Sequence, residues 1–176
     1  VALVTTIASA HREFFKSEEE IADAKGEIFE GLEPGGTAIL PFDSPHYARL
    51  RTKAEKHAAR ILSFGRGDGA DVRVLDEFAL ADGTQITAQL PDCELAFTLS
   101  QPGAHWVSNS MAVLAVVHAL GGDMAAAGLA LADLEGIAGR GARFKAQVEG
   151  GTALIIDESY NANPASMAAT LAVLKE

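Results

Sequence analysis

Three groups of residues in this 176-residue sequence combine side chains that can bind an anion, a metal ion or a polar ligand. The first is His11 together with Lys25, 14 residues later. The second is the run Gly103-Ala104-His105-Trp106-Val107-Ser108-Asn109. The third joins Gly139-Arg140-Gly141-Ala142-Arg143 to Asp157-Glu158-Ser159-Tyr160-Asn161-Ala162-Asn163-Pro164.

The first group lies at the end of a predicted strand. The β-branched apolar run Val1–Ile7 favours a strand buried on both faces of a parallel sheet, and His11 follows it. Ligands bind at this end of parallel strands, and Lys25 lies on the next predicted helix, where it could reach them. The alternative is a histidine at a strand end and a lysine whose stem covers apolar surface.

The second group stands where a helix is expected to begin, at about Val107. The N-terminus of a helix attracts anions and polar ligands, so the polar and aromatic side chains of this run could form a binding site. The alternative is structural: Ser108 or Asn109 caps the helix and Trp106 packs.

The third group is too polar for a simple connection. An arginine of this group, Arg140 or Arg143, can bind phosphate through its guanidinium, and an acidic residue, Asp157 or Glu158, can accept hydrogen bonds from ribose hydroxyls. Asn161 and Asn163 can hydrogen-bond to backbone at a junction between domains.

Repeating patterns predict the elements that position these groups. Ser17-Glu18-Glu19-Glu20 is typical of a capped helix start, and the helix is expected to reach about Leu32. Its predicted apolar face is Ile21, Ala24, Ile28 and Leu32. A strand over Thr37–Leu40 would complete a βαβ unit. A helix over Pro45–His57 and a strand over Arg60–Phe64 follow.

The middle of the chain predicts antiparallel strands, and helices then return. The expected strands are Val72–Leu75, Glu77–Ala81, Gln85–Leu90 and Glu94–Leu99, with a hairpin turn at Asp82-Gly83. Further elements are helices over Val107–Leu120 and Met124–Leu131, a hairpin around Gly150-Gly151 and a helix from about Pro164. The predicted fold class is α/β: a mostly parallel central sheet flanked by helices, with a small antiparallel β meander.

Composition narrows the classes of function. The chain is 48% hydrophobic and 22% charged, with 14 Lys+Arg against 24 Asp+Glu and a formal net charge of -10. This acidity disfavours nucleic acid or an anionic membrane as partner. The single Cys93 cannot form an internal disulfide, and no apolar run reaches the roughly 18 residues of a membrane span, so we expect a cytoplasmic protein.

Several familiar sites are absent from the sequence. There is no Gly-x-x-x-x-Gly-Lys-Ser/Thr phosphate loop, and the five histidines lack zinc-site spacing. The glycine-rich segment 65–69 lacks the strand-to-helix setting of a dinucleotide site and predicts a turn. The chain opens inside a predicted strand without methionine and closes in a helical pattern at Lys175-Glu176, so we expect a piece of a longer protein.

Four segments in this order resemble the Mur ligases of peptidoglycan synthesis. They are Val4-Thr5-Thr6-Ile7-Ala8-Ser9-Ala10-His11, Ala24-Lys25-Gly26-Glu27-Ile28-Phe29, residues 103–109, and residues 157–167. The resemblance is strongest to the branch that adds D-alanyl-D-alanine, because Tyr160-Asn161-Ala162-Asn163-Pro164 differs in sister ligases. It implies that residues 1–160 are the later part of the central ATP-binding domain, and that 161–176 are the hinge and first helix of the C-terminal domain.

The resemblance also implies a reaction. Members use ATP to phosphorylate a carboxylate, and an amine then attacks the acyl phosphate. The implied substrates are UDP-N-acetylmuramoyl-tripeptide and D-alanyl-D-alanine, with ATP and Mg2+ as cofactors. His11 and Lys25 match the catalytic metal-site residues, and in several members this lysine is carbamylated to a metal-binding anion.

The implied nucleotide site uses the other two groups. Asn109 matches an asparagine at the adenine, with His105 beside it, and Trp106 replaces the usual companion asparagine. Arg143 matches an arginine at phosphate, and Glu158 an acid at the ribose that is usually Asp, so Asp157 remains a rival. Asn161 and Asn163 fall at the hinge.

The phosphate loop, the UDP-sugar-binding domain and the rest of the C-terminal domain of that family have no counterpart in these residues. We therefore expect the chain alone to be inactive, to bind ATP weakly at best, and to be a monomer. Rival interpretations are a diaminopimelate- or lysine-adding Mur enzyme, a folylpolyglutamate-type ligase, or a non-catalytic interaction domain on the same fold. A phosphate loop roughly a hundred residues upstream in the reading frame would favour an enzyme.

Overall fold

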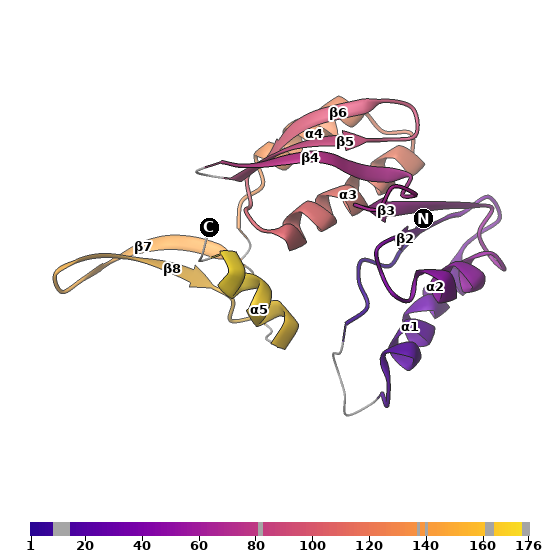
Figure 1. Cartoon of the computed structure of the whole chain (residues 1–176), viewed down its shortest axis with the longest axis horizontal. Helices are drawn as coiled ribbons and strands as arrows, with labels where there is room; N and C mark the ends of the chain where they lie inside the picture. Colours follow the sequence, from indigo (N-terminus) through magenta and orange to yellow (C-terminus); the bar gives the residue numbers. More distant parts are fainter. Residues whose placement is uncertain (9–14, 81–82, 137, 140, 161–163, 174–176) are drawn as a thin grey trace.

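The computed structural model describes residues 1–8, 15–80, 83–136, 138–139, 141–160 and 164–173 (Figure 1). Within them a six-stranded sheet has the order β1-β2-β3-β4-β5-β6, and β7 and β8 form a separate antiparallel hairpin. The strands are β1 Ala2–Leu3, β2 Thr37–Pro41, β3 Arg60–Gly65, β4 Val72–Leu80, β5 Gly83–Gln89, β6 Glu94–Leu99, β7 Ala142–Val148 and β8 Gly151–Asp157. The helices are α1 Glu18–Gly26, α2 Tyr47–Ala54, α3 Ala104–Ala119, α4 Met124–Ala132 and α5 Pro164–Val173, with a 3-10 turn η1 over Glu27–Gly31.

The direction of strand pairing changes within the six-stranded sheet. The pairs β1–β2, β2–β3 and β3–β4 are parallel, whereas β4–β5 and β5–β6 are antiparallel. The predicted α/β class is therefore confirmed: parallel strands with crossover helices, extended by an antiparallel meander along one edge.

Two core clusters lie on opposite faces of the sheet because side chains alternate along each strand. In β2, Ile39 belongs to the cluster under α3, and Ala38 and Leu40 belong to the cluster under η1 and α2. The α3 cluster, called the main core cluster below, is formed by buried residues of β2–β6 and of the two helices on that face. Its members are Ile39, Leu62, Phe64, Val72, Ile86, Ala88, Leu90, Phe97, Leu99, Val107, Met111, Ala112, Leu114, Ala115 and Leu131.

The first helix begins as predicted and ends differently. The backbone N–H of Glu20 donates to Ser17 Oγ at 3.3 Å, which confirms Ser17 as the N-cap. The Glu20 carboxylate accepts from the Lys16 N–H at 2.8 Å. After Gly26 the helix tightens into η1, whose three residues per turn rotate the later side chains. Phe29 is consequently buried, and the predicted core residue Ile28 is 49% exposed.

Three strand predictions need correction. β1 covers only Ala2–Leu3, followed by one further bond from the Val4 N–H to the Ile39 carbonyl, so the strand predicted over Val1–Ile7 is too long. The two strands predicted on either side of Asp76 are the single strand β4, with a register shift between Val74 and Asp76. Gly83 pairs with Leu80 as the first residue of β5, and residues 81–82 of the predicted turn lie outside the described part.

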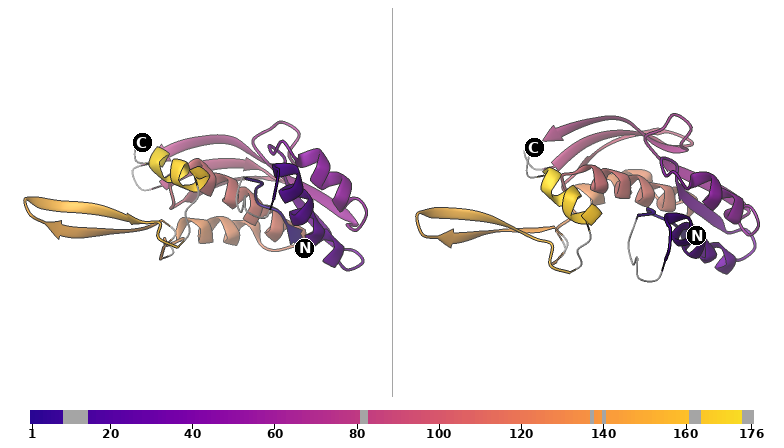
Figure 2. Two further views of the ribbon diagram at one scale, coloured as in Figure 1. Left: turned by 90° about the horizontal axis from the view of Figure 1, so that it is seen from below. Right: turned by 60° about the horizontal axis from the view of Figure 1, so that its bottom comes forward.

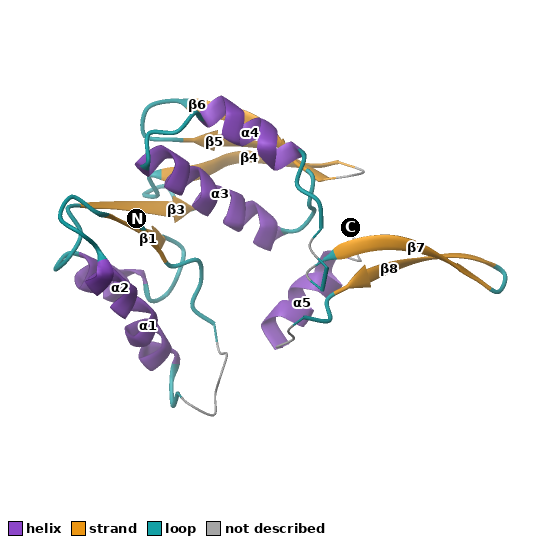
Figure 3. Cartoon of the chain, turned by 180° about the vertical axis from the view of Figure 1, so that it is seen from behind, coloured by secondary structure: helices purple, strands orange, loops and turns teal. Residues whose placement is uncertain are grey.

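The β7–β8 hairpin extends away from the six-stranded sheet, and α5 lies beside its base (Figures 2 and 3). The hairpin is longer than predicted, because its register runs from the pair Ala142–Asp157 to the pair Val148–Gly151. In the part of the chain that the structure describes, no helix is both long and apolar enough to cross a membrane.

Candidate functional site

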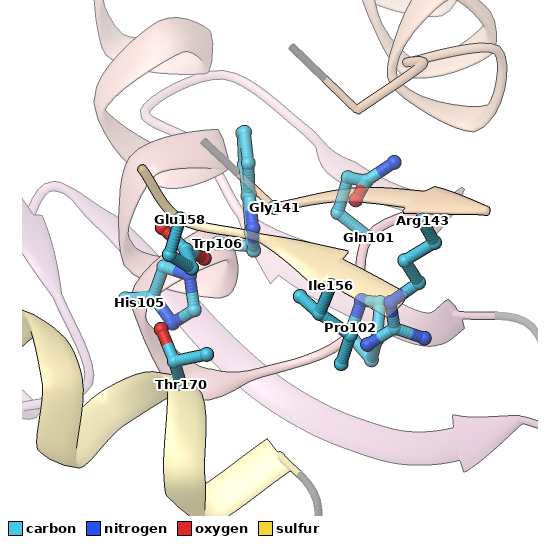
Figure 4. A pocket seen from close by; sticks show the side chains of 9 residues that line it. All are labelled: Gln101, Pro102, His105, Trp106, Gly141, Arg143, Ile156, Glu158 and Thr170. Atoms are coloured by element: carbon cyan, nitrogen blue, oxygen red, sulfur yellow. The ribbon is translucent and has the colours of Figure 1, made fainter. Parts of the chain in front are cut away.

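A pocket forms where the start of α3, the base of the hairpin and α5 meet (Figure 4). Three segments that are far apart in sequence therefore contribute to one site. Its lining residues are Gln101, Pro102, His105, Trp106, Gly141, Arg143, Ile156, Glu158 and Thr170. His105 and Trp106 of the second group thus lie near Gly141, Arg143 and Glu158 of the third.

The start of α3 is set by Gly103 rather than by a polar cap. Gly103 is the N-cap with φ 113°, a backbone angle that favours glycine, and no side chain caps the helix. The helix therefore begins at Ala104, earlier than predicted, and His105 and Trp106 occupy its first turn. Ser108 and Asn109 lie inside the helix and are exposed, so the interpretation of either as a cap is wrong.

The hairpin contributes side chains from one of its two faces. Arg143 and Ile156 are direct cross-strand partners, so their side chains share a face. Successive residues of a strand point to opposite faces, so Asp157, the last residue of β8, lies on the other side. Gly141 and Glu158, which flank the two strands, line the pocket together with Arg143 and Ile156. Figure 4 shows Glu158 beside His105, with Arg143 on the other side of the pocket near Pro102 and Ile156.

The Asp157 carboxylate is hydrogen-bonded to nearby backbone N–H groups. Its carboxylate accepts hydrogen bonds from the Gly139 N–H at 2.9 Å and from the Ser159 N–H at 3.1 Å. Hydrogen bonding from Ser159, and then from the Gly139 backbone, lowers the pKa of this carboxyl. Of the two acids left open by the sequence, the structure therefore places Glu158 in the pocket and gives Asp157 a structural position.

Within the described part of the chain, the charged side chains that line the pocket, Arg143 and Glu158, form no ion pair with each other. Burial lowers the pKa of His105, and the nearby Glu158 carboxylate opposes that shift, so the imidazole is neutral at pH 7. Among the described residues, Arg143 forms no ion pair and no side-chain hydrogen bond, so its guanidinium is available to an anion.

The pocket is small in this conformation. Its cavity volume is about 20 Å³, room for about one water molecule. A bound nucleotide would lie partly outside this space or displace part of its wall. Thr170 belongs to that wall, and its hydroxyl donates to the Ser166 carbonyl of α5 at 3.2 Å.

Lys25 lies in a different place, beside the segment that follows β1. Its Nζ donates to the Thr6 carbonyl at 2.9 Å, and it borders a separate open cavity of about 380 Å³ with residues of β1 and α1. The lysine therefore does reach the C-terminal end of β1. His11, Asn161 and Asn163 lie outside the described residues, so the predicted pairing of His11 with Lys25 and the predicted hinge stay predictions.

The described residues do not by themselves form a metal site. Among them no group of three His, Cys, Asp or Glu side chains could hold a metal ion. Lys25 donates a hydrogen bond through its ammonium group, which is not a ligand for Mg2+. Asn109, predicted to contact adenine, is exposed on α3 and is not among the residues that line the pocket.

Sequence reasoning missed Gln101, Pro102, Ile156 and Thr170. Ile156 had a detectable signal, because it lies in β8 two residues before Glu158, the spacing of side chains that share one face of an extended chain. Thr170 had none, since only the packing of α5 brings it to the pocket.

Comparisons with known proteins agree with this architecture. Residues 1–117 match the family described as Mur ligase middle domain. The chain is 34% identical, over 99% of its length, to UDP-N-acetylmuramoyl-tripeptide–D-alanyl-D-alanine ligase of Escherichia coli K12. It is 32% identical, again over 99%, to UDP-N-acetylmuramate–L-alanine ligase of Streptomyces coelicolor.

Solved structures show the same likeness. A crystal structure of MurF from Acinetobacter baumannii is 32% identical, with a TM-score of 0.86 over 98% of this chain and 36% of that one. MurF from Thermotoga maritima in complex with ADP has a TM-score of 0.78 over 99% of this chain and 38% of that one, at 27% identity.

The matched length is the whole of this chain and a minor part of each relative. The chain spans 38% of the E. coli ligase and 37% of the S. coelicolor ligase. The family match covers residues 1–117, and the similarity to relatives extends through the hairpin and α5. On these grounds the chain belongs to the Mur ligase family.

Proposed function

We propose that this chain is the nucleotide-binding part of an ATP-dependent ligase that adds D-alanyl-D-alanine to UDP-N-acetylmuramoyl-tripeptide. The observation that carries the proposal is the 34% identity to the E. coli ligase of that name over 99% of the chain. In this proposal residues 1–160 belong to the central ATP-binding domain, and residues 161–176 are the hinge and first helix of the next domain. The enzyme would act in the cytoplasm as a monomer.

The proposed roles follow the chemistry of the pocket. Arg143 binds a phosphate of ATP through its unpaired guanidinium, and Glu158 accepts hydrogen bonds from the ribose hydroxyls. His105 is neutral there and can accept or donate one hydrogen bond without adding charge. Binding ATP in a fixed orientation is the contribution of these residues to phosphoryl transfer, where positioning and electrostatics do most of the work.

His11 and Lys25 remain predicted magnesium-site residues, and Asn109 a predicted adenine contact. Such a role for Lys25 is supported by its hydrogen bond to the Thr6 carbonyl, in the segment that follows β1, because α/β proteins bind ligands beyond the C-terminal ends of parallel strands. A metal-binding role would require its amine to become an anion, which a carbamate supplies.

A second candidate is the ligase that adds L-alanine to UDP-N-acetylmuramate, because the S. coelicolor enzyme of that name is 32% identical over nearly the same length. The Tyr160-Asn161-Ala162-Asn163-Pro164 segment favours the first candidate. The substrates distinguish the two directly.

The test uses the complete reading frame that encodes this chain. The purified protein is given ATP with UDP-N-acetylmuramoyl-tripeptide and D-alanyl-D-alanine, or with UDP-N-acetylmuramate and L-alanine, and phosphate release and product mass are measured. We expect turnover only with the first pair, its loss in Lys25→Ala, and no turnover by the 176-residue chain alone. Turnover only with L-alanine would replace the proposal by the second candidate, and no nucleotide binding at all would favour an interaction domain.

A further inference from the structure

We propose that Lys53 of α2 is a positioning residue for Lys25: its ammonium group fixes the last turn of α1, so that the Lys25 amine lies at the segment that follows β1. The inference rests on the proposed function, because that function gives Lys25 its predicted part in the reaction. Helices α1 and α2 lie side by side (Figure 1).

The end of α1 frees a backbone carbonyl from its usual helical partner. In a continuing α-helix the Glu27 N–H would donate to the Asp23 carbonyl, four residues back. Here that N–H donates to the Ala24 and Lys25 carbonyls, because the chain tightens into η1. The Asp23 carbonyl accepts from Lys53 Nζ at 2.8 Å. A side chain from the neighbouring helix therefore completes the end of α1.

The stem of Lys53 passes close to Gly26, the residue next to Lys25. A Cβ atom on Gly26 would lie 2.7 Å from Lys53 Cδ, well inside the distance at which carbon atoms pack. Gly26 is buried and has φ −68°, an ordinary helical value. The glycine is therefore needed for space and not for backbone conformation: it admits the lysine stem that carries Nζ to the Asp23 carbonyl.

The Asp23 carboxylate adds an ion pair at the surface. Its Oδ1 lies 3.6 Å from Lys53 Nζ, and its Oδ2 accepts from Arg49 Nη1 at 3.0 Å. The Asp23 and Arg49 side chains are 42% and 45% exposed, so water screens this pair and it contributes little. The bond from Lys53 to the backbone carbonyl is the contact that fixes the turn itself.

The position of Lys25 depends on that turn. Lys25 Nζ donates to the Thr6 carbonyl at 2.9 Å, and Lys25 is two residues from the carbonyl that Lys53 holds. A shift of the turn would carry the amine away from Thr6. A misplacement of about 1 Å in a reacting group can cost about a hundredfold in rate.

The first test separates catalysis from nucleotide binding. On the protein from the complete reading frame, kcat and the KM for ATP are measured with UDP-N-acetylmuramoyl-tripeptide and D-alanyl-D-alanine. Lys53→Ala should lower kcat by about ten- to a hundredfold and leave the KM for ATP within about twofold, because the pocket beside α3 is untouched. Lys56→Ala, at an exposed lysine just after α2, is the matched control and should change neither constant.

A second variant tests the route through Gly26. Gly26→Ala displaces the Lys53 stem and should reproduce the loss of kcat. In the double variant Gly26→Ala/Lys53→Ala the added methyl group occupies vacated space, so the loss should equal that of Lys53→Ala alone. Two unrelated destabilising changes would instead multiply their effects.

A third measurement needs no ligase activity. The rate at which acetic anhydride modifies Lys25 is compared, by peptide mass spectrometry, with that of the exposed Lys145 on the hairpin. Lys53→Ala should raise this ratio by about fivefold, the factor that corresponds to losing one hydrogen bond of typical net strength. Lys56→Ala should leave it unchanged.

The outcomes distinguish the two proposals. If Lys53→Ala keeps the wild-type kcat and labelling ratio, or if the losses in the double variant multiply, the positioning role is wrong while the proposed function stands. If the wild type shows no ligase activity and the ratio still rises in Lys53→Ala, the proposed function falls and the positioning of Lys25 by Lys53 stands.

Discussion

The six-stranded sheet and the β7–β8 hairpin differ in how deeply their side chains are buried. The sheet has a core on both faces, with side chains such as Phe64 and Leu114 fully or almost fully buried. The hairpin has Phe144, Val148 and Leu154 at 50% exposure or more. Yet the hairpin contributes Arg143 and Glu158 to the pocket, whereas the sheet contributes none of the lining residues. Stability and ligand recognition therefore reside largely in different parts of this chain.

The difference has a physical basis. A two-stranded hairpin has little stability of its own, and local stability follows the number of buried apolar contacts. Residues on such an element can shift to admit a ligand at low cost. Admission of a nucleotide, as proposed for this pocket, to a cavity of about 20 Å³ would require movement of this kind.

The difference in burial between the sheet and the hairpin is tested most directly by substituting one phenylalanine in each. Phe64→Ala, in the centre of the main core cluster, should lower the free energy of unfolding by about 3–5 kcal/mol, because it removes a buried ring and leaves a cavity. Phe144→Ala, on the hairpin, should cost less than about 1 kcal/mol. Urea denaturation followed by circular dichroism measures both, and equal losses would show that the hairpin is as firmly packed as the sheet.

A hydrogen-bonded contact between the buried Ser63 and the exposed Asp71 gives a second, smaller effect. Asp71 Oδ2 accepts from the Ser63 backbone N–H at 2.8 Å and from its hydroxyl at 2.7 Å, next to the core. Asp71→Ala leaves those two buried donors without this acceptor and should destabilise the chain by about 1–3 kcal/mol. The double variant Ser63→Ala/Asp71→Ala should recover part of the loss in the same denaturation assay, since the hydroxyl is then gone as well.

The smallest effect concerns pH and the pocket. Because burial holds the pKa of His105 below its ordinary value of 6.5, the unfolded chain binds more protons near pH 6 than the folded one. The stability contributed by the neutral imidazole is therefore complete above about pH 6.5 and is lost as the pH falls toward the lowered value.

Removing the opposing charge should enlarge that shift. In Glu158→Gln the pKa of His105 should fall further, because the carboxylate that raises it is gone. An NMR titration of the His105 ring protons reports the value directly. His105→Gln is the matched control for the melting temperature between pH 5 and 7, and it should remove this part of its pH dependence. A pKa that rises in Glu158→Gln would contradict the geometry of the pocket.

Local signals predicted most of the elements. The Ser17 cap locates the start of α1, the apolar run Thr37–Leu40 locates β2, and the glycines at 150–151 locate the turn of the hairpin. Errors arise where tertiary packing competes with local pattern. Helical spacing predicts Ile28 in the core, but the tighter η1 buries Phe29 instead. Polar residues near Asp76 indicate a break, yet pairing with β5 continues through it as a bulge.

The residues of the site were predictable only in part, because some reach the pocket through local pattern and others only through tertiary packing. Alternation along β8 could have distinguished Glu158 from Asp157, since only one of two adjacent side chains can face the pocket. The contribution of Thr170 depends on how α5 packs, which no local pattern encodes. The start of α3 depends on the positive φ of Gly103. The sequence pattern favours a polar residue at the helix cap instead, because polar side chains are the usual N-caps.

The change from parallel to antiparallel pairing also has a kinetic consequence. Strands β4, β5 and β6 follow one another through short turns, whereas joining β1 to β2 and β2 to β3 requires closure over α1 or α2. Short loops close at a lower entropic cost, and local pairing is fast. We therefore expect the meander to form first and to offer β4 as the template on which β3 assembles. The folding rate of the domain would then be set by its parallel half.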